Sequence, residues 1–262
     1  ALQNLGSYAS RPGAETERQA LAKVMIKTLE EKEMPLTIKN LFVLQLERIG
    51  KAESVPGLAK LLKAEDIHLR DYARTALEKN PDASATDALL KELNSAADSS
   101  WKIGLINSLG ERKAESAVST IAKALNDSDA KVAASAVTAL SYIGNEASIQ
   151  TLTEVINKPS SPIYLKAGQG LVDIAQAKAA KKQTADAGKI FDAIYEITSK
   201  NVSNAPDATS IRIAAINGVI NCSPEKGATL ITKFINDENP KIRTAAVAGA
   251  RLSSSDEPVK AL

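Results

Sequence analysis

Only a few residues of this 262-residue chain have side chains suited to catalysis or metal binding. The chain has one histidine, His68, and one cysteine, Cys222, and no glycine-rich phosphate loop or Cys-x-x-Cys pair. Any Ser–His–Asp or Cys–His arrangement would have to use His68, and sites with two or more histidine ligands are excluded. We interpret His68 as a surface residue and Cys222 as a buried, inert thiol. We therefore expect no catalytic residue, metal or cofactor, and a protein that is not an enzyme.

Basic side chains offer a different chemistry, the binding of acidic groups. Four lysines lie between residues 175 and 189, namely Lys178, Lys181, Lys182 and Lys189. The segment has one acid, Asp186, and is either a solvated extension or a basic contact for an acidic partner. The whole chain has 33 Lys and Arg against 31 Asp and Glu, a net charge of +2. This balance gives no strong nucleic-acid signal.

Aromatic side chains make up only 3% of the chain, with three Phe, five Tyr and one Trp. Tyr72 and Trp101 each lie three residues past the anchor of a recurring pattern described below, as Leu41 does. One interpretation places them on the flank of a core. The alternative is an exposed aromatic strip that anchors a binding partner.

The apolar residues of the chain recur with the period of a helix. We therefore expect helices to position the basic and aromatic side chains described above. Residues 129–144 place Val132, Ala136, Leu140 and Ile143 on one helix face. The same frame recurs with its first position, the anchor, at residues 38, 69, 98, 132, 163, 211 and 242. The anchors are about 31 residues apart, apart from one interval that is longer by about 17.

A second helical pattern lies between successive anchors, at residues 54–64, 116–126, 147–157 and 225–236 among others. Each of these segments follows a turn containing Gly or Pro and ends in a polar link. No strand pattern is present. A two-helix unit of this size cannot bury its own apolar face, so the copies must stack into an α-solenoid.

The repeat resembles the short bacterial type of the HEAT-repeat family. The resemblance rests on an Asp or Asn three residues before the anchor and an Arg after it, as in Asp66…Leu69-Arg70, Asn239…Ile242-Arg243 and, without the Arg, Asp129…Val132. It implies an all-α, right-handed superhelix of about seven two-helix repeats. It also implies that Arg70, Arg212 and Arg243 form a polar ladder between repeats, with a phosphate- or acid-binding column as the alternative. HEAT-like hydroxylases need paired His-Glu metal motifs, which one histidine cannot supply.

The pattern predicts one solenoid domain over residues 1–262, with an insertion at about 175–190. Residues 1–6 match the end of an anchor-bearing helix, and residues 256–262 match the start of a helix of the other kind. Neither end has the polar character of a capping repeat. We therefore expect the chain to be a fragment of a longer protein.

Four branched apolar residues break the polar face of the anchor-bearing helices, namely Leu165, Val172, Ile213 and Ile220. If they are exposed, they form a groove for a partner's apolar segment with Lys181 and Lys182 on its rim. If the insertion folds back or the helical phase slips, they are simply buried.

The sequence therefore predicts a non-catalytic protein-binding scaffold that takes a protein or peptide partner and is monomeric in isolation. The alternatives are a nucleic-acid-binding solenoid and an accessory or lyase-like protein that assists an enzyme. No apolar run is long enough to span a bilayer. The single cysteine excludes an intrachain disulfide and fits the cytoplasm or the periplasm.

Overall fold

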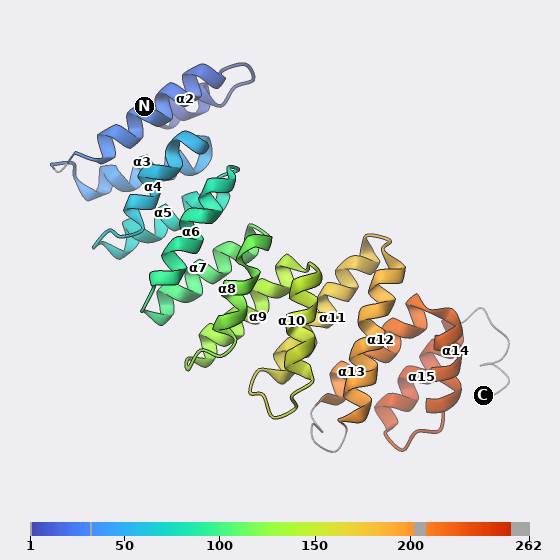
Figure 1. Cartoon of the computed structure of the whole chain (residues 1–262). Coiled ribbons are helices and arrows are strands. Elements are labelled where there is room, and N and C mark those ends of the chain that lie inside the picture. The colour runs from blue at the N-terminus through green and yellow to red at the C-terminus, as the bar shows by residue number, and fades with distance from the viewer. Residues whose placement is uncertain (1, 32, 202–207, 253–262) are drawn as a thin grey trace. The chain divides into compact units, whose positions relative to one another are not determined.

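The computed structural model describes residues 2–31, 33–201 and 208–252, and every regular element within these ranges is a helix (Figure 1). The chain divides into two compact units, residues 1–124 and 125–262. The prediction of an all-α helical-repeat solenoid is confirmed. The prediction of a single domain over residues 1–262 is not tested and stays a prediction.

The first unit contains eight α-helices and two short 3-10 helices among its described residues. They are α1 (Leu2–Ala9), α2 (Glu15–Leu29), α3 (Leu36–Ile49), η1 (Ala52–Ser54), α4 (Val55–Leu61), α5 (Ile67–Lys79), α6 (Ala83–Ser95), α7 (Ser99–Glu111), η2 (Glu115–Ala117) and α8 (Val118–Ala124). The even-numbered α-helices are called A helices and the odd-numbered ones, which carry the anchors, B helices. His68 lies exposed in the first turn of α5, as expected of a surface residue.

The second unit continues the same alternation. Its helices are α9 (Ala130–Ile143), α10 (Glu146–Ile156), α11 (Tyr164–Ala180), α12 (Thr184–Lys200), α13 (Thr209–Cys222), α14 (Pro224–Phe234) and α15 (Pro240–Leu252). Seven A–B pairs, from α2–α3 to α14–α15, therefore occur in the described residues, as the spacing predicts. The helix start expected at residues 256–262 lies outside them.

Helices α5, α7 and α9 begin where the polar links predict, because a link carboxylate caps each of them. Asp66 accepts the backbone N–H of Leu69, and Asp98 accepts that of Trp101, each at 2.8 Å. Such caps satisfy amides that have no partner inside the helix. Helix α9 ends at Gly144, whose φ of 60° lies in the left-handed region that glycine adopts without a Cβ clash.

The caps also correct the phase of the third repeat. Asp98 takes the capping place that Asp66 has in the second repeat, so the anchor is Trp101 rather than residue 98. Six anchors are at most 8% exposed: Leu69, Trp101, Val132, Ile163, Ile211 and Ile242. The first anchor, Ile38, is 39% exposed. The core of each unit thus follows the column of anchors, with one open position at α3.

The expected insertion is not a separate element. Residues 175–190 form the end of α11 and the start of α12, each 17 residues long, with a turn at residues 181–183. Both helices are longer than the other helices of the described residues, which accounts for part of the long anchor interval. Cys222 ends α13 and is half-buried rather than buried, and burial raises the pKa of its thiol.

Candidate functional site

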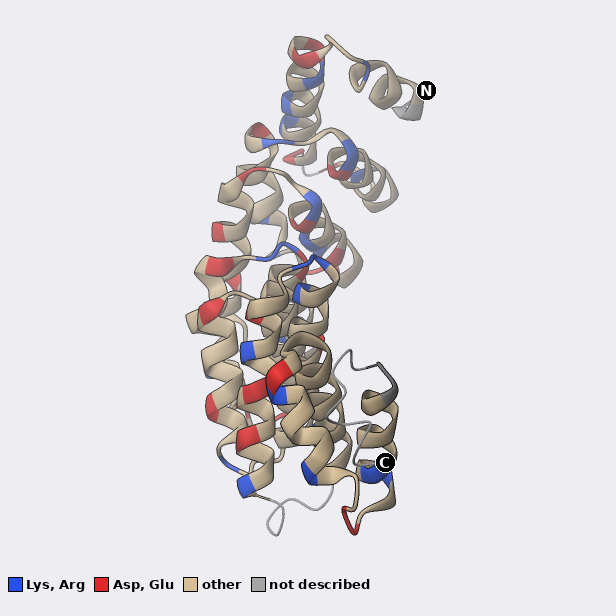
Figure 2. Ribbon diagram, turned by 90° about the vertical axis from the view of Figure 1, so that its right-hand side faces the viewer, with Lys and Arg blue, Asp and Glu red and all other residues tan. Residues whose placement is uncertain are grey.

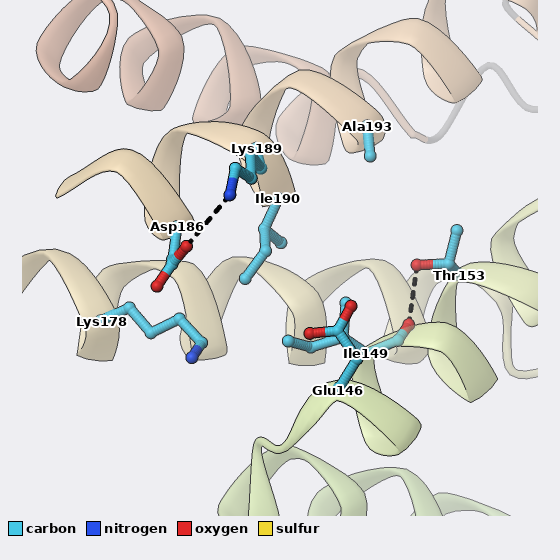
Figure 3. A pocket seen from close by; sticks show the side chains of 8 residues that line it. All are labelled: Glu146, Ile149, Thr153, Lys178, Asp186, Lys189, Ile190 and Ala193. Atoms are coloured by element: carbon cyan, nitrogen blue, oxygen red, sulfur yellow. Dashed lines mark hydrogen bonds and ion pairs between the residues drawn. The ribbon is translucent and has the colours of Figure 1, made fainter. Parts of the chain in front are cut away.

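A pocket of about 230 Å³ opens between α10 and α12, above the C-terminal half of α11 (Figure 3). It is lined by Glu146, Ile149, Thr153, Lys178, Asp186, Lys189, Ile190 and Ala193. Helix α11 contributes Lys178 near its C-terminal end, and α12 contributes residues from its first three turns.

The centre of the pocket is apolar. Ile149 from α10 and Ile190 from α12 point into the space between the two A helices (Figure 3). Ile190 is buried, whereas Ile149 is half-buried and reaches the surface. Thr153 and Ala193 lie toward one end of the pocket (Figure 3), and the hydroxyl of Thr153 is engaged in a 2.7 Å hydrogen bond to the Ile149 carbonyl. The floor therefore suits an apolar side chain.

The opposite end of the pocket is charged, with Lys178, Asp186 and Lys189 around it (Figure 3). The Lys189 ammonium lies 3.3 Å from the Asp186 carboxylate, in an exposed ion pair. The turn directly after α11 adds two more amines, the exposed Lys181 and Lys182. The lining itself is balanced, because Glu146 and Asp186 oppose Lys178 and Lys189, and the excess of positive charge comes from Lys181 and Lys182 in the adjoining turn.

The apolar groove predicted from Leu165, Val172, Ile213 and Ile220 is only half present. Leu165 is 44% exposed and Ile213 is half-buried, whereas Val172 and Ile220 are buried. The four residues therefore do not form the exposed patch that the sequence suggests, and a role of Leu165 and Ile213 in binding stays a prediction.

Close helix packing through glycines explains the burial of Ile220. Ile220 fills the space beside Gly249 of α15 and Gly227 of α14, where a Cβ would clash. Gly168 of α11 similarly leaves room for Ile211 of α13, and Val172 lies one turn further along the same face. A helical-wheel projection of the sequence places these residues on exposed helix faces, because it does not include such close approaches between helices.

Trp101 and Tyr72 do not form an exposed aromatic strip. Trp101 is 8% exposed, and its indole N–H donates to Glu92 at 3.2 Å. The Arg70 guanidinium covers the ring at 4.6 Å from its centroid. Tyr72 is half-buried. Trp101 is buried because it occupies an anchor position, so the two aromatics are not equivalent in the repeat.

The arginines of the predicted ladder do not act alike. Asp66 and Asn239 cap helices, Arg70 stacks on Trp101 of the next repeat, and Arg243 donates to carbonyls of its own link. An arginine outside the predicted column also joins neighbouring repeats. Arg112, after α7, donates to the carbonyls of Leu77, Glu78, Asn80 and Asp82 and to the Thr86 hydroxyl. Sequence reasoning missed Arg112, although an arginine directly after a B helix is a usable signal.

A second hollow, of about 370 Å³, lies in the first unit between the α1–α2 turn and the ends of α3 and α5. Most of the charges around it are paired. Arg18, only 7% exposed, bridges Glu53 at 2.5 Å and Glu15 at 2.8 Å. Lys51 also reaches Glu15, at 2.9 Å. These pairs hold the pKa of Glu15 at about 2 through the hydrogen bonds from Arg18 and Lys51. The hollow is a salt-bridged joint rather than an open binding site.

Three further findings concern the alternatives. The described residues contain no group of three or more His, Cys, Asp or Glu side chains placed to hold a metal ion. None of the helices in the described ranges is long and apolar enough to cross a membrane. Figure 2 shows basic and acidic residues mixed along the helices of each unit.

Comparison with known proteins identifies the repeats. Residues 86–171 match the family model for HEAT repeats. No curated protein matches the chain in sequence. Similar solved structures include human deoxyhypusine hydroxylase in complex with glycerol, at 13% identity and a TM-score of 0.46, covering 92% of this chain and 99% of that one. The complex of CpcE and CpcF of phycocyanin lyase from Nostoc sp. matches at 17% identity and a TM-score of 0.39. The match covers 95% of this chain and 94% of that one.

The expectation that the chain is not an enzyme is corrected by these matches. Two of the similar structures are named for enzymes, a hydroxylase and a lyase. The same repeat architecture serves proteins of unrelated function, so it gives no ground to exclude catalysis. At these identities neither activity is assigned to this chain.

Proposed function

This chain is a HEAT-repeat protein, and from that premise we propose that it is a protein-binding scaffold whose α10–α12 pocket receives a segment of a partner protein. The segment has an apolar side chain next to acidic residues. The apolar floor next to the exposed lysines of the turn between α11 and α12 is the observation that carries this proposal.

The apolar part of the proposed contact is a single side chain. A pocket of about 230 Å³ is below the range of ~300–1,000 Å³ usual for whole small-molecule ligands, and it suits one anchoring residue of a longer segment. Binding anchors of this kind lie in desolvated pockets surrounded by polar groups. Ile149 and Ile190 provide the apolar contact, and Thr153 closes one end.

The electrostatic part favours acidic residues beside the anchor. Lys178, Lys181, Lys182 and Lys189 are opposed by Asp186 and by Glu146, which also lines the pocket, so the lysines of the adjoining turn leave an excess of positive charge. Exposed charges of this kind contribute more to the rate and specificity of association than to affinity. Binding is therefore expected to weaken with added salt but not to vanish.

A peptide selection tests the proposal. A phage-displayed library of short random peptides is selected on the immobilised wild-type protein, and the enriched peptides are assayed by fluorescence anisotropy. We expect peptides with an aromatic or aliphatic residue flanked by Asp or Glu. Their affinity should fall about 30-fold or more for Ile149→Glu, because a carboxylate would be placed in the apolar floor.

The matched control is Ile67→Glu, which changes an isoleucine that is 61% exposed on α5 in the other unit. This variant should bind the selected peptides as the wild type does. If enriched peptides bind the Ile149→Glu variant undiminished, or carry no acidic residues, the pocket is not the docking site.

A further inference from the structure

The pocket between α10 and α12 lies in a groove that has a direction. Thr153 of α10 and Ala193 of α12, which follow the floor isoleucines in the sequence, lie together at one end of it (Figure 3). Asp186, in the first turn of α12, lies at the other end (Figure 3). Both helices therefore run the same way, and the N-terminal ends of α10 and α12 lie together at the charged end of the groove.

Side chains tie the next pair of A helices together but leave this pair untied. Between α12 and α14, Lys226 forms an ion pair with Asp192, and the Lys233 ammonium lies 3.1 Å from the Tyr195 hydroxyl. Along the described lengths of α10 and α12, by contrast, no hydrogen bond or ion pair joins one helix to the other. The groove between α10 and α12 is therefore open to a side chain from outside.

The apolar floor has the form of a hole bounded by four side chains. They are Ile149 and Thr153, four residues apart on α10, and Ile190 and Ala193, three residues apart on α12. Residues at these spacings are neighbours on a helix surface. A hole bounded by four side chains is where a packed helix inserts one side chain of its own. The shape of the floor thus favours a side chain that projects from a helix.

The floor offers little to the backbone of a bound segment. The side chains of Ile149, Ile190 and Ala193 have no polar atoms, and the hydroxyl of Thr153 already donates to a carbonyl of its own helix. An extended segment lying over this floor would turn N–H and C=O groups toward apolar surface without a partner, which costs free energy. A helix satisfies these groups within itself. The chemistry of the floor therefore favours a helical segment over an extended one.

We infer that this partner segment, whose existence rests on the proposed function, is an amphipathic helix that runs antiparallel to α10 and α12. An aliphatic or aromatic side chain of this helix enters the hole. The same face carries Asp or Glu about four and seven residues later, one and two turns further on. These acids lie beside the charged end of the groove and the turn that holds Lys181 and Lys182.

Electrostatics sets the direction of the helix. The N-terminal end of a helix carries a partial positive charge and the C-terminal end a partial negative charge. The N-terminal ends of α10 and α12 lie at the charged end of the groove, where the exposed Lys181 and Lys182 add an excess of positive charge. An antiparallel helix brings both its acidic side chains and the negative end of its dipole to these lysines. A parallel helix would bring the positive end of its dipole there.

The remaining charges do not change this preference. The carbonyls at the C-terminal end of α11 lie at the same end, but backbone N–H groups of the following turn donate to those of Ala177, Lys178 and Ala179. Near the C-terminal ends of α10 and α12, exposed acids and lysines of the described residues balance, namely Glu154 and Glu196 against Lys158 and Lys200. The excess of charge therefore lies at the end with Lys181 and Lys182.

Peptides from the selection that need Ile149 for binding are the probes of the helical form. Circular dichroism of the mixture, minus the spectra of peptide and protein alone, should show a gain of helix on binding. Proline placed two residues after the anchor should weaken binding about 30-fold or more, because proline breaks a helix interior. Alanine at the same place should bind within about twofold of the parent peptide.

Failure of the helical form and failure of the pocket give different results. Peptides that depend on Ile149 but gain no helix, or that tolerate the proline, would overturn the helical form and leave the pocket as a docking site. Peptides that bind the Ile149→Glu variant undiminished would overturn both.

A reversed peptide and a charge exchange test the direction. The parent sequence in reverse order, with the same hydrocarbon staple to keep both peptides helical, should bind about 10-fold more weakly. Lys181→Glu/Lys182→Glu should weaken binding of the parent peptide about 10-fold, and lysine in place of the peptide's second acid should restore most of the loss.

The matched control is Lys158→Glu/Lys200→Glu, the same change of charge at the other end of the groove, which should leave binding within about twofold. A reversed peptide as tight as the parent, equal losses from the two lysine pairs, or an exchange that restores nothing would each overturn the antiparallel direction.

Discussion

Replacing Arg112 should show how much of the stability of the first unit resides in a contact between repeats. The guanidinium lies across the C-terminal end of α5 and donates to four backbone carbonyls and to the Thr86 hydroxyl. The last carbonyls of a helix have no partner within the helix. The Arg112 side chain is half-buried, and this burial lowers the pKa of its guanidinium.

The magnitude follows from these contacts. A hydrogen bond from a charged donor contributes about 1.5–3 kcal/mol, but one nitrogen serves three of the carbonyls and water can reach some of them after the change. We therefore expect Arg112→Met, which keeps the apolar stem, to lower the free energy of unfolding by about 2–4 kcal/mol. Arg112→Lys should lower the free energy of unfolding by about half as much, because a lysine ammonium can make only some of the hydrogen bonds that the planar guanidinium donates.

Urea denaturation followed by circular dichroism measures the loss, and hydrogen exchange locates it. Contacts in repeat proteins are between neighbours, so exchange should accelerate in α5, α6 and α7 and stay unchanged in α11, α12 and α13. A Met variant within about 0.5 kcal/mol of the wild type would refute the reasoning, because it would mean that water satisfies the freed carbonyls equally well.

Three further changes have defined outcomes. Leu140→Ala should cost about 2–5 kcal/mol in chemical denaturation, because the fully buried side chain leaves a cavity. Lys113→Gly should stabilise by up to ~1 kcal/mol, measured in the same way, because Lys113 has a φ of 51° that favours glycine. Burial raises the pKa of Glu53, but hydrogen bonds, above all from Arg18, outweigh it and hold that pKa below its ordinary value of 4.5. The contribution of ionised Glu53 to the free energy of unfolding is therefore complete above pH ~5 and is lost as the pH falls through the lowered pKa. The melting temperatures of the wild type and Glu53→Gln should accordingly differ at pH 7 and converge in acid.

The sequence predicted the architecture because apolar period, polar links and caps agree with one another. Anchors such as Val132 and Ile242 are buried as the 31-residue spacing requires. The apolar period alone places the anchor of the third repeat three residues too early, at residue 98, whereas the Asp98 carboxylate caps α7. Alignment of Asp98 with the capping Asp66 places Trp101 in the core.

The candidate site was predictable only in part. The lysines at 178–189 were recognised as a basic cluster, but the apolar floor beside them was not. Ile149 lies about 40 residues from Ile190 in the sequence, and only the stacking of α10 on α12 brings them together. The predicted exposure of Ile220 failed for the converse reason, because Gly227 and Gly249 on neighbouring helices let its side chain be enclosed.

Methyl NMR tests the central claim, that the α10–α12 pocket binds a partner segment, most directly. Protein labelled at its isoleucine δ1 methyl groups is titrated with an acidic, apolar-anchored peptide obtained from the selection. The account predicts that the signals of Ile149 and Ile190 shift with saturable dependence on peptide concentration, while that of Ile67 in the other unit stays fixed. Peptide binding that shifts other isoleucines, such as Ile213, and leaves Ile149 and Ile190 unmoved would contradict it.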